Sequence, residues 1–103
     1  MWKMNIDFNS ITARLILGDQ MELSLIKPKN VRDDLYQYTL RWGTGDGFAP
    51  MNCYWKENLT AENWDEAKSK AIRRSKYIIN SYIHELNYAM EVMNNGILQN
   101  LGG

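Results

Sequence analysis

The residues of this chain that are best suited to binding or chemistry lie between positions 70 and 88, where basic and aromatic side chains recur every three or four residues. On a helix this spacing places them on one face, which carries Lys70, Arg73, Arg74, Tyr77, Ser81, His84 and Tyr88. Cations with interleaved aromatic rings can hold a nucleic-acid backbone and stack on bases. Tyrosine and arginine are also the favoured anchors of protein interfaces. A third interpretation is a solvated helix face without a partner.

The net charge decides between the two binding interpretations. The 12 Lys and Arg residues are balanced by 12 Asp and Glu residues, so the formal charge is zero. A protein that works mainly through phosphate contacts is usually basic. We therefore expect a small non-enzymatic protein-interaction module, an adaptor or inhibitor encoded by a phage or another mobile element. Nucleic-acid binding by the same helix face is the alternative.

A glycine-rich segment from Gly43 to Gly47 is the next candidate, because such loops can cradle phosphates. A phosphate loop needs a helix directly after it and usually a lysine at a fixed spacing. Here Phe48, Ala49 and Pro50 follow, and then a predicted strand. The segment is better interpreted as a hairpin loop. We expect Phe48 to contact a partner, since a large apolar group in a glycine-rich loop has few neighbours to pack against.

The sequence shows no constellation of catalytic or metal-binding residues. His84 is the only histidine, and no carboxylate lies three or four residues from it. Cys53, the only cysteine, falls on a predicted core face, where thiols are usually inert. Asp65 and Glu66 are explained by the start of a helix. We therefore expect no enzymatic activity, no metal and no cofactor.

The composition limits where the protein can work. Apolar residues make up 45% and charged residues 23%, which is typical of a globular protein. No apolar run approaches the roughly 18 residues that a membrane-spanning helix needs, and the N-terminal segment lacks a signal-peptide pattern. A single cysteine cannot form an intramolecular disulfide. These features predict a cytoplasmic protein without a membrane partner.

The elements that position these residues begin with strands. Alternation of apolar and polar residues predicts strands over residues 2–8, 11–17, 21–26, 35–42 and 51–56. Their polar positions define a second candidate surface, opposite the core, with Arg14, Gln37, Thr39, Arg41, Tyr54 and Lys56. Sheets that bind RNA expose aromatic rings flanked by cations, but an ordinary solvated sheet surface has similar residues. Most of the other aromatic residues are expected in the core: Trp2, Tyr36, Tyr38, Trp42, Trp55, Trp64 and Tyr82.

From residue 63 the apolar period changes from two to 3.6, which predicts a helix. Asn63 and Glu66 match a capping box, and Gly96 after two asparagines predicts the helix end. The predicted buried stripe contains Trp64, Ala67, Ala71, Ser75, Ile78, Tyr82, Leu86, Ala89 and Met93. The predicted fold class is α+β, an antiparallel β-sheet of four to five strands in a meander followed by one long C-terminal α-helix packed on one sheet face. We expect a single domain over residues 1–103, with the sheet at 2–56, the helix at about 64–94 and a short tail at 97–103.

The helix is predicted to be longer than the sheet. At 1.5 Å per residue, residues 64–94 span about 46 Å, whereas a strand of seven residues spans about 23 Å. Either the helix breaks near Asn80 or Asn87, or its second half meets the N-terminal strand, the tail or another subunit. A homodimer built on Ile83, Leu86, Met90 and Met93 is our hypothesis for the last case.

Overall fold

The computed structural model of the chain describes residues 1–29, 31–43 and 53–102, and the side chains of the same ranges except those of residues 53 and 97–102. Within these ranges the elements are the strands β1 (Lys3–Ile6), β2 (Ser10–Gly18), β3 (Met21–Pro28), β4 (Leu35–Trp42) and β5 (Cys53–Thr60), followed by the helix α1 (Trp64–Gly102). The chain divides into two compact units, Met1–Arg73 and Arg74–Gly103. Each unit is described by itself below.

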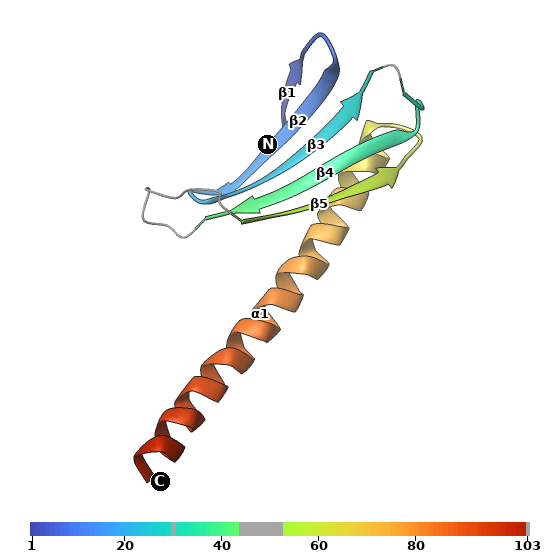
Figure 1. The fold of residues 1–103 in the computed structure, drawn as a ribbon. Helices are drawn as coiled ribbons and strands as arrows, with labels where there is room; N and C mark the ends of the chain where they lie inside the picture. The colour runs from blue at the N-terminus through green and yellow to red at the C-terminus, as the bar shows by residue number, and fades with distance from the viewer. Residues whose placement is uncertain (30, 44–52, 103) are drawn as a thin grey trace. The chain divides into compact units, whose positions relative to one another are not determined.

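The first unit contains an antiparallel meander. Each strand pairs with the next one along the chain, so the strands lie side by side in the order β1 to β5 (Figure 1). Turns of few residues connect β1 to β2 and β2 to β3, and the register is regular except for a shift between Ile16 and Gly18. The predicted fold class, an α+β meander with a C-terminal helix, is confirmed.

One face of this sheet is the core. Ala13, Leu25 and Tyr38 lie directly opposite one another on β2, β3 and β4, and none of them is exposed to solvent. Leu23 and Leu40 form the neighbouring row and are equally buried. These residues alternate along their strands with polar residues of the other face, as the period of two predicts. Tyr36 and Tyr38 are buried as expected.

The first turns of α1, Trp64–Arg73, cover the core face. The backbone N–H of Glu66 donates to Asn63 Oδ1 at 2.9 Å, so Asn63 caps the helix as predicted. Ala67 and Ala71 are fully buried. Trp64 packs edge-on against the ring of Tyr36. The predicted packing of the helix start on one sheet face follows from these contacts.

The N-terminal strand joins the sheet but is less buried than its alternation predicts. Met4 and Ile6 of β1 are exposed, and so is Phe8 beyond its end. β1 is an edge strand of four residues with β2 as its one neighbour in the sheet. Trp2 is half-buried, with Lys68 Nζ 5.7 Å from its ring centroid, so cover by α1 reaches only the beginning of this strand. Trp55, on the opposite edge strand, is 40% exposed and is not the core residue we expected.

The helix α1 is continuous from Trp64 to Gly102. It has no break at Asn80 or Asn87. The predicted end near residue 94 is wrong by eight residues, and the expected tail at 97–103 belongs to the helix as far as Gly102. Ser81 is accommodated in the helix because its hydroxyl donates to the carbonyl of Tyr77 at 3.0 Å. Asparagine and glycine lower helix propensity by up to about 1 kcal/mol per residue, but they do not forbid a helix. Gly96 therefore lies within α1 instead of ending it.

Burial along α1 ends earlier than the predicted stripe. Ser75 and Ile78 are buried, in agreement with that stripe, but every residue from Asn80 to Asn95 is exposed. Tyr82, Leu86 and Met93 belong to the predicted buried stripe and are 44%, 62% and 58% exposed. From Asn80 onward the apolar spacing continues along the sequence, but the side chains at these positions are exposed. The prediction of a buried face is therefore wrong for this part of the helix.

Candidate functional site

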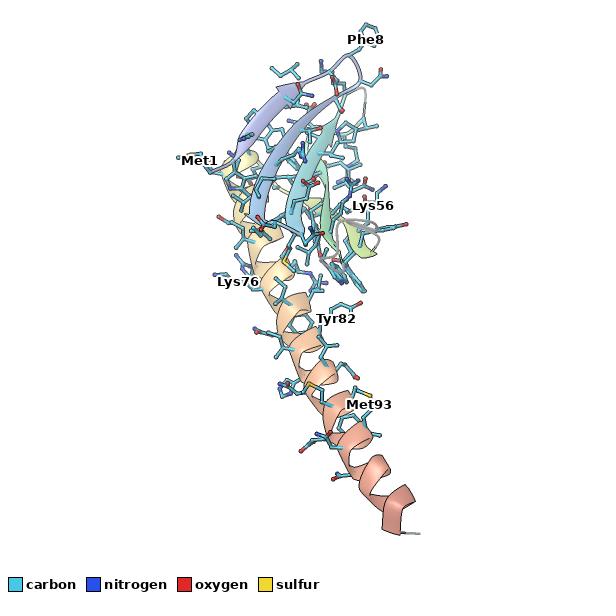
Figure 2. All side chains as sticks on the ribbon, turned by 90° about the vertical axis from the view of Figure 1, so that its left-hand side faces the viewer. Met1, Phe8, Lys56, Lys76, Tyr82 and Met93 are labelled. Carbon is cyan, nitrogen blue, oxygen red and sulfur yellow. The ribbon has the colours of Figure 1, made fainter. Side chains whose placement is uncertain are left out.

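The second half of α1 carries a series of exposed large apolar side chains. Between Tyr82 and Met93 the exposed apolar residues are Tyr82, Ile83, Leu86, Tyr88, Met90, Val92 and Met93, each exposed by 44% to 65%. Figure 2 labels Tyr82 and Met93, whose side chains stand out from this stretch of the helix. Side chains of this size normally become buried when a protein folds or binds. This stretch is therefore the candidate site.

One stripe of this stretch has regular spacing, and we call it the apolar seam: Ile79, Ile83, Leu86, Met90 and Met93. Its members follow one another at intervals of four, three, four and three residues. At 100° per residue they lie within an arc of about 80°. Ile79 is half-buried and the other four members are at least half exposed. The seam is continuous along about 21 Å of helix.

A second stripe, which we call the outer face, lies on the opposite side of the same helix. It consists of Arg74, Tyr77, Ser81, His84 and Tyr88, at intervals of three, four, three and four residues. Its centre is about 180° from the centre of the apolar seam. Tyr77 and Tyr88 are 66% and 65% exposed, and His84 and Arg74 are also exposed. The structure thus places these predicted site residues together on one face.

Lys70 and Arg73, the other basic residues predicted for the site, belong to the first unit. Lys70 Nζ donates to the carbonyl of Thr60 at 2.7 Å and lies 3.0 Å from Glu66 Oε1. The hydrogen bond from the Lys70 ammonium lowers the pKa of Glu66, with the Coulombic attraction of the pair acting in the same direction. Lys70 therefore joins the first turns of α1 to the end of β5, whereas Arg73 is exposed.

Phe48, the remaining predicted partner-binding residue, lies outside the described residues. The interpretation of its loop stays a prediction.

The sheet face opposite the core contains the residues predicted for it. Arg14 and Lys56 lie in one cross-strand row with Thr39, while Arg41 lies opposite Tyr54. The sequence did not single out Glu22, which is buried on this face and accepts a hydrogen bond from Arg14 Nη2. Arg41 Nη1 lies 3.6 Å from the other oxygen of the same carboxylate. The period of two along β3 already places Glu22 on this polar face. Its position opposite Arg41 is the signal from which an ion pair could have been predicted.

This arrangement gives the cations of the sheet a structural role. A buried carboxylate is costly unless it is paired and hydrogen-bonded. Arg14 and Arg41 supply that pairing from the two strands that flank Glu22. The guanidinium groups that we considered for nucleic-acid binding are therefore engaged in joining β2, β3 and β4. Tyr54 and Lys56 of the same predicted surface are exposed.

A hollow of about 270 Å³ lies in the first unit beside Trp64, between the end of β3 and the turn that follows it. Its charged lining residues include Lys27 and Lys29. Lys27 Nζ lies over the Tyr36 ring at 5.3 Å, and Lys29 Nζ donates to the carbonyl of Asp7 at 2.8 Å. Both ammonium groups thus have structural contacts, and Asp33 is the acidic residue of the lining.

Comparisons with known proteins add nothing to this geometry. No family model, curated protein or solved structure matches the chain. Among the described residues, no three His, Cys, Asp or Glu side chains come together as a metal ion would require. The described part of the chain also contains no helix that is both long and apolar enough to cross a membrane.

Proposed function

We propose that this chain is a non-enzymatic protein-interaction module that binds a protein partner through the second half of α1. The observation that carries the proposal is the unbroken exposure of residues 80–95, in which large apolar side chains recur on a regular helix. Monomeric proteins rarely leave such a stripe uncovered, and contiguous apolar patches usually mark interaction sites. The sheet and the first turns of α1 act as the folded base from which this helix continues.

The apolar seam supplies binding energy in this proposal. Completing the burial of a half-exposed Ile, Leu or Met side chain is worth on the order of 1 kcal/mol. The occupant of the seam is either a second copy of the chain, as in the expected homodimer, or a different protein. In both cases several side chains become buried together, which also stabilises the helix that carries them.

The outer face supplies specificity. Tyr77, Tyr88 and Arg74 are residue types that dominate the binding energy of protein interfaces. Because the outer face is opposite the seam, one helix can contact two partners at once. Such a protein acts by occlusion or by bridging, as an adaptor or inhibitor in the cytoplasm, and a phage or another mobile element is the source we propose for it.

A pull-down from a lysate of the source organism tests this role for the outer face. The bait pair is the wild-type chain and the double variant Tyr77→Ala with Tyr88→Ala. The matched control is Tyr54→Ala, because Tyr54 on β5 is also 65% exposed. We expect a stoichiometric partner that is retained by the wild type and the control and lost by the double variant. Full retention by the double variant, or no stoichiometric partner, would contradict the proposal.

Nucleic-acid binding remains the second candidate, supported by the exposure of Arg73, Arg74 and Lys76. Lys70 contributes less than the sequence suggested, since its ammonium is engaged by Thr60 and Glu66. Counterion release predicts that affinity for a single-stranded oligonucleotide falls steeply with salt, by an amount set by the number of phosphates contacted. Titration by fluorescence anisotropy at two salt concentrations checks this. Absence of binding at low salt removes the candidate.

A further inference from the structure

We infer that the partner seated on the apolar seam is a second copy of this chain, paired through residues 79–93 of α1 as a two-stranded coiled coil. The inference rests on the proposed function in one respect, namely that the seam is an interface. It goes further because it names the occupant and the residues that pair.

The spacing of the seam matches a heptad repeat. Intervals of four and three residues alternate without a break, so Ile79, Leu86 and Met93 take d positions while Ile83 and Met90 take a positions. The average interval of 3.5 residues keeps the seam facing a partner helix when the two helices supercoil. A β-branched residue at a followed by leucine at d, as in Ile83 and Leu86, favours two strands over three or four.

The seam has a defined beginning. The a position that precedes Ile79 is occupied by Lys76, which is exposed. Burying an ammonium group between two helices without a partner charge costs stability. Pairing therefore starts at Ile79, and in the sequence the same spacing continues past Met93 to Ile97.

The positions that flank the seam favour self-pairing. Asparagine recurs at the e positions 80, 87 and 94, and the g positions hold Tyr82, Ala89 and Gly96. None of these six residues carries a formal charge. Charges at e and g normally select one coiled-coil partner and exclude others through attraction and repulsion. Uncharged e and g positions do not repel an identical helix. They also provide no charge that would attract a foreign helix with charged flanking positions.

The charges of this part of the helix also argue against other occupants. Between Lys76 and Gly96 the sequence has no lysine or arginine, whereas Glu85 and Glu91 lie on the polar side at c and b positions. Amphipathic helices that lie on anionic membranes are rich in cations on the polar side. Nucleic acid would also require cations along its path. A second copy, which is bound by apolar contact alone, meets neither obstacle.

Multi-angle light scattering of the full chain, at concentrations from roughly 1 to 100 µM where micromolar self-association is resolved, tests the inference. We expect the wild type to approach twice its chain mass of 12.1 kDa as the concentration rises. Leu86→Glu places a charge at the centre of the seam and is expected to give the monomer mass throughout. Val92→Glu is the matched control, because Val92 is 49% exposed on the same helix but lies at a c position outside the seam. This variant is expected to dimerise like the wild type.

Three results would overturn the inference: a wild type that stays at 12.1 kDa across the range, a dimeric Leu86→Glu, or equal dissociation of both variants. Leu86 is 62% exposed, so its substitution leaves the core of the sheet intact, and an unchanged tryptophan fluorescence spectrum verifies that the sheet is folded. A monomeric wild type that still retains a partner through Tyr77 and Tyr88 would overturn the self-pairing and leave the proposed function standing. Conversely, a stable dimer together with no captured partner would support the self-pairing and contradict the role proposed for the outer face.

Discussion

Trp64 meets Tyr36 edge to face, with ring centroids 5.2 Å apart and ring planes at 78°. Trp64 is the first residue of α1, and Tyr36 lies near the beginning of β4. The Tyr36 ring is fully buried and also lies under Lys27 Nζ. Aromatic contacts of this geometry add about 0.5–1.5 kcal/mol to the burial of the rings. The pair therefore fixes where the helix starts on the core face.

The two buried tyrosines of β4 are expected to respond differently to loss of their hydroxyl groups. Tyr38 Oη donates to Glu57 Oε2 at 2.7 Å, whereas Tyr36 Oη has no hydrogen-bond partner among the described residues. Tyr38→Phe should lower the free energy of unfolding by about 1 kcal/mol, since it removes a hydrogen bond to a half-buried carboxylate. Tyr36→Phe should be neutral or stabilising. Urea denaturation of the two variants side by side checks this order, and an equal loss in both would contradict it.

The cap of α1 gives a second prediction. Asn63→Ala removes the acceptor of the Glu66 N–H and should destabilise the protein by about 1 kcal/mol. Asn87→Ala makes the same chemical change at an exposed position within the helix. It should be neutral or slightly stabilising, because alanine has the higher helix propensity. The midpoints of thermal unfolding, followed by circular dichroism, separate the two outcomes. A destabilised Asn87→Ala with an unaffected Asn63→Ala would show that the cap is unimportant.

The sequence was sufficient to predict the elements whose pattern has a local cause. The period of two along residues 35–42 reproduces β4, and the cap at Asn63 locates the start of α1. It was insufficient where the result depends on what covers a residue. Met4 and Leu86 occur in the same apolar patterns as buried residues, yet both are exposed. The periodicity of a sequence indicates which side chains share a face, but it does not indicate whether another element covers that face.

The candidate site shows the same division. The spacing from Arg74 to Tyr88 predicted a common helix face, and the helix forms there. The engagement of Lys70 with Thr60 and the burial of Glu22 depend on tertiary approach, so composition alone could not reveal them. The end of the helix was misplaced for an energetic reason. Asn94, Asn95 and Gly96 weaken a helix locally, but a local preference is overridden when the flanking segments remain helical.

The ion pairs of Glu22 predict an asymmetry between removing the acid and removing its partners. Replacing both Arg14 and Arg41 with methionine leaves a buried carboxylate without a counter-charge, which should cost about 3–5 kcal/mol. Glu22→Gln leaves two guanidinium groups that are about half exposed and can be solvated. Its cost should be smaller, about 1 kcal/mol. Urea denaturation at neutral pH measures both, and a larger loss in Glu22→Gln would show that Glu22 does not need the two arginines.

The pH dependence of stability is expected to contain a contribution from two exposed ion pairs. Hydrogen bonds from Lys70 and Arg32 lower the pKa values of Glu66 and Asp34, respectively. A carboxylate whose pKa is lowered by folding stabilises the protein above its unfolded pKa of about 4. That stabilisation is lost as the pH falls through the lowered pKa, when the folded protein must also take up the proton. The urea midpoint should therefore fall as the pH is lowered from about 5 toward 3.

A double-mutant cycle isolates the contribution of the Glu66–Lys70 pair to this decrease of the urea midpoint at low pH. Glu66→Gln keeps the backbone N–H that Asn63 caps and removes the titrating group, so its urea midpoint should fall less steeply with acid than that of the wild type. In a Lys70→Met background the donor that lowers the pKa of Glu66 is absent. The same Glu66→Gln substitution should then leave the slope nearly unchanged. Equal effects of Glu66→Gln in both backgrounds would mean that the acid sensitivity comes from another carboxylate, because a contribution from this pair requires both of its charges.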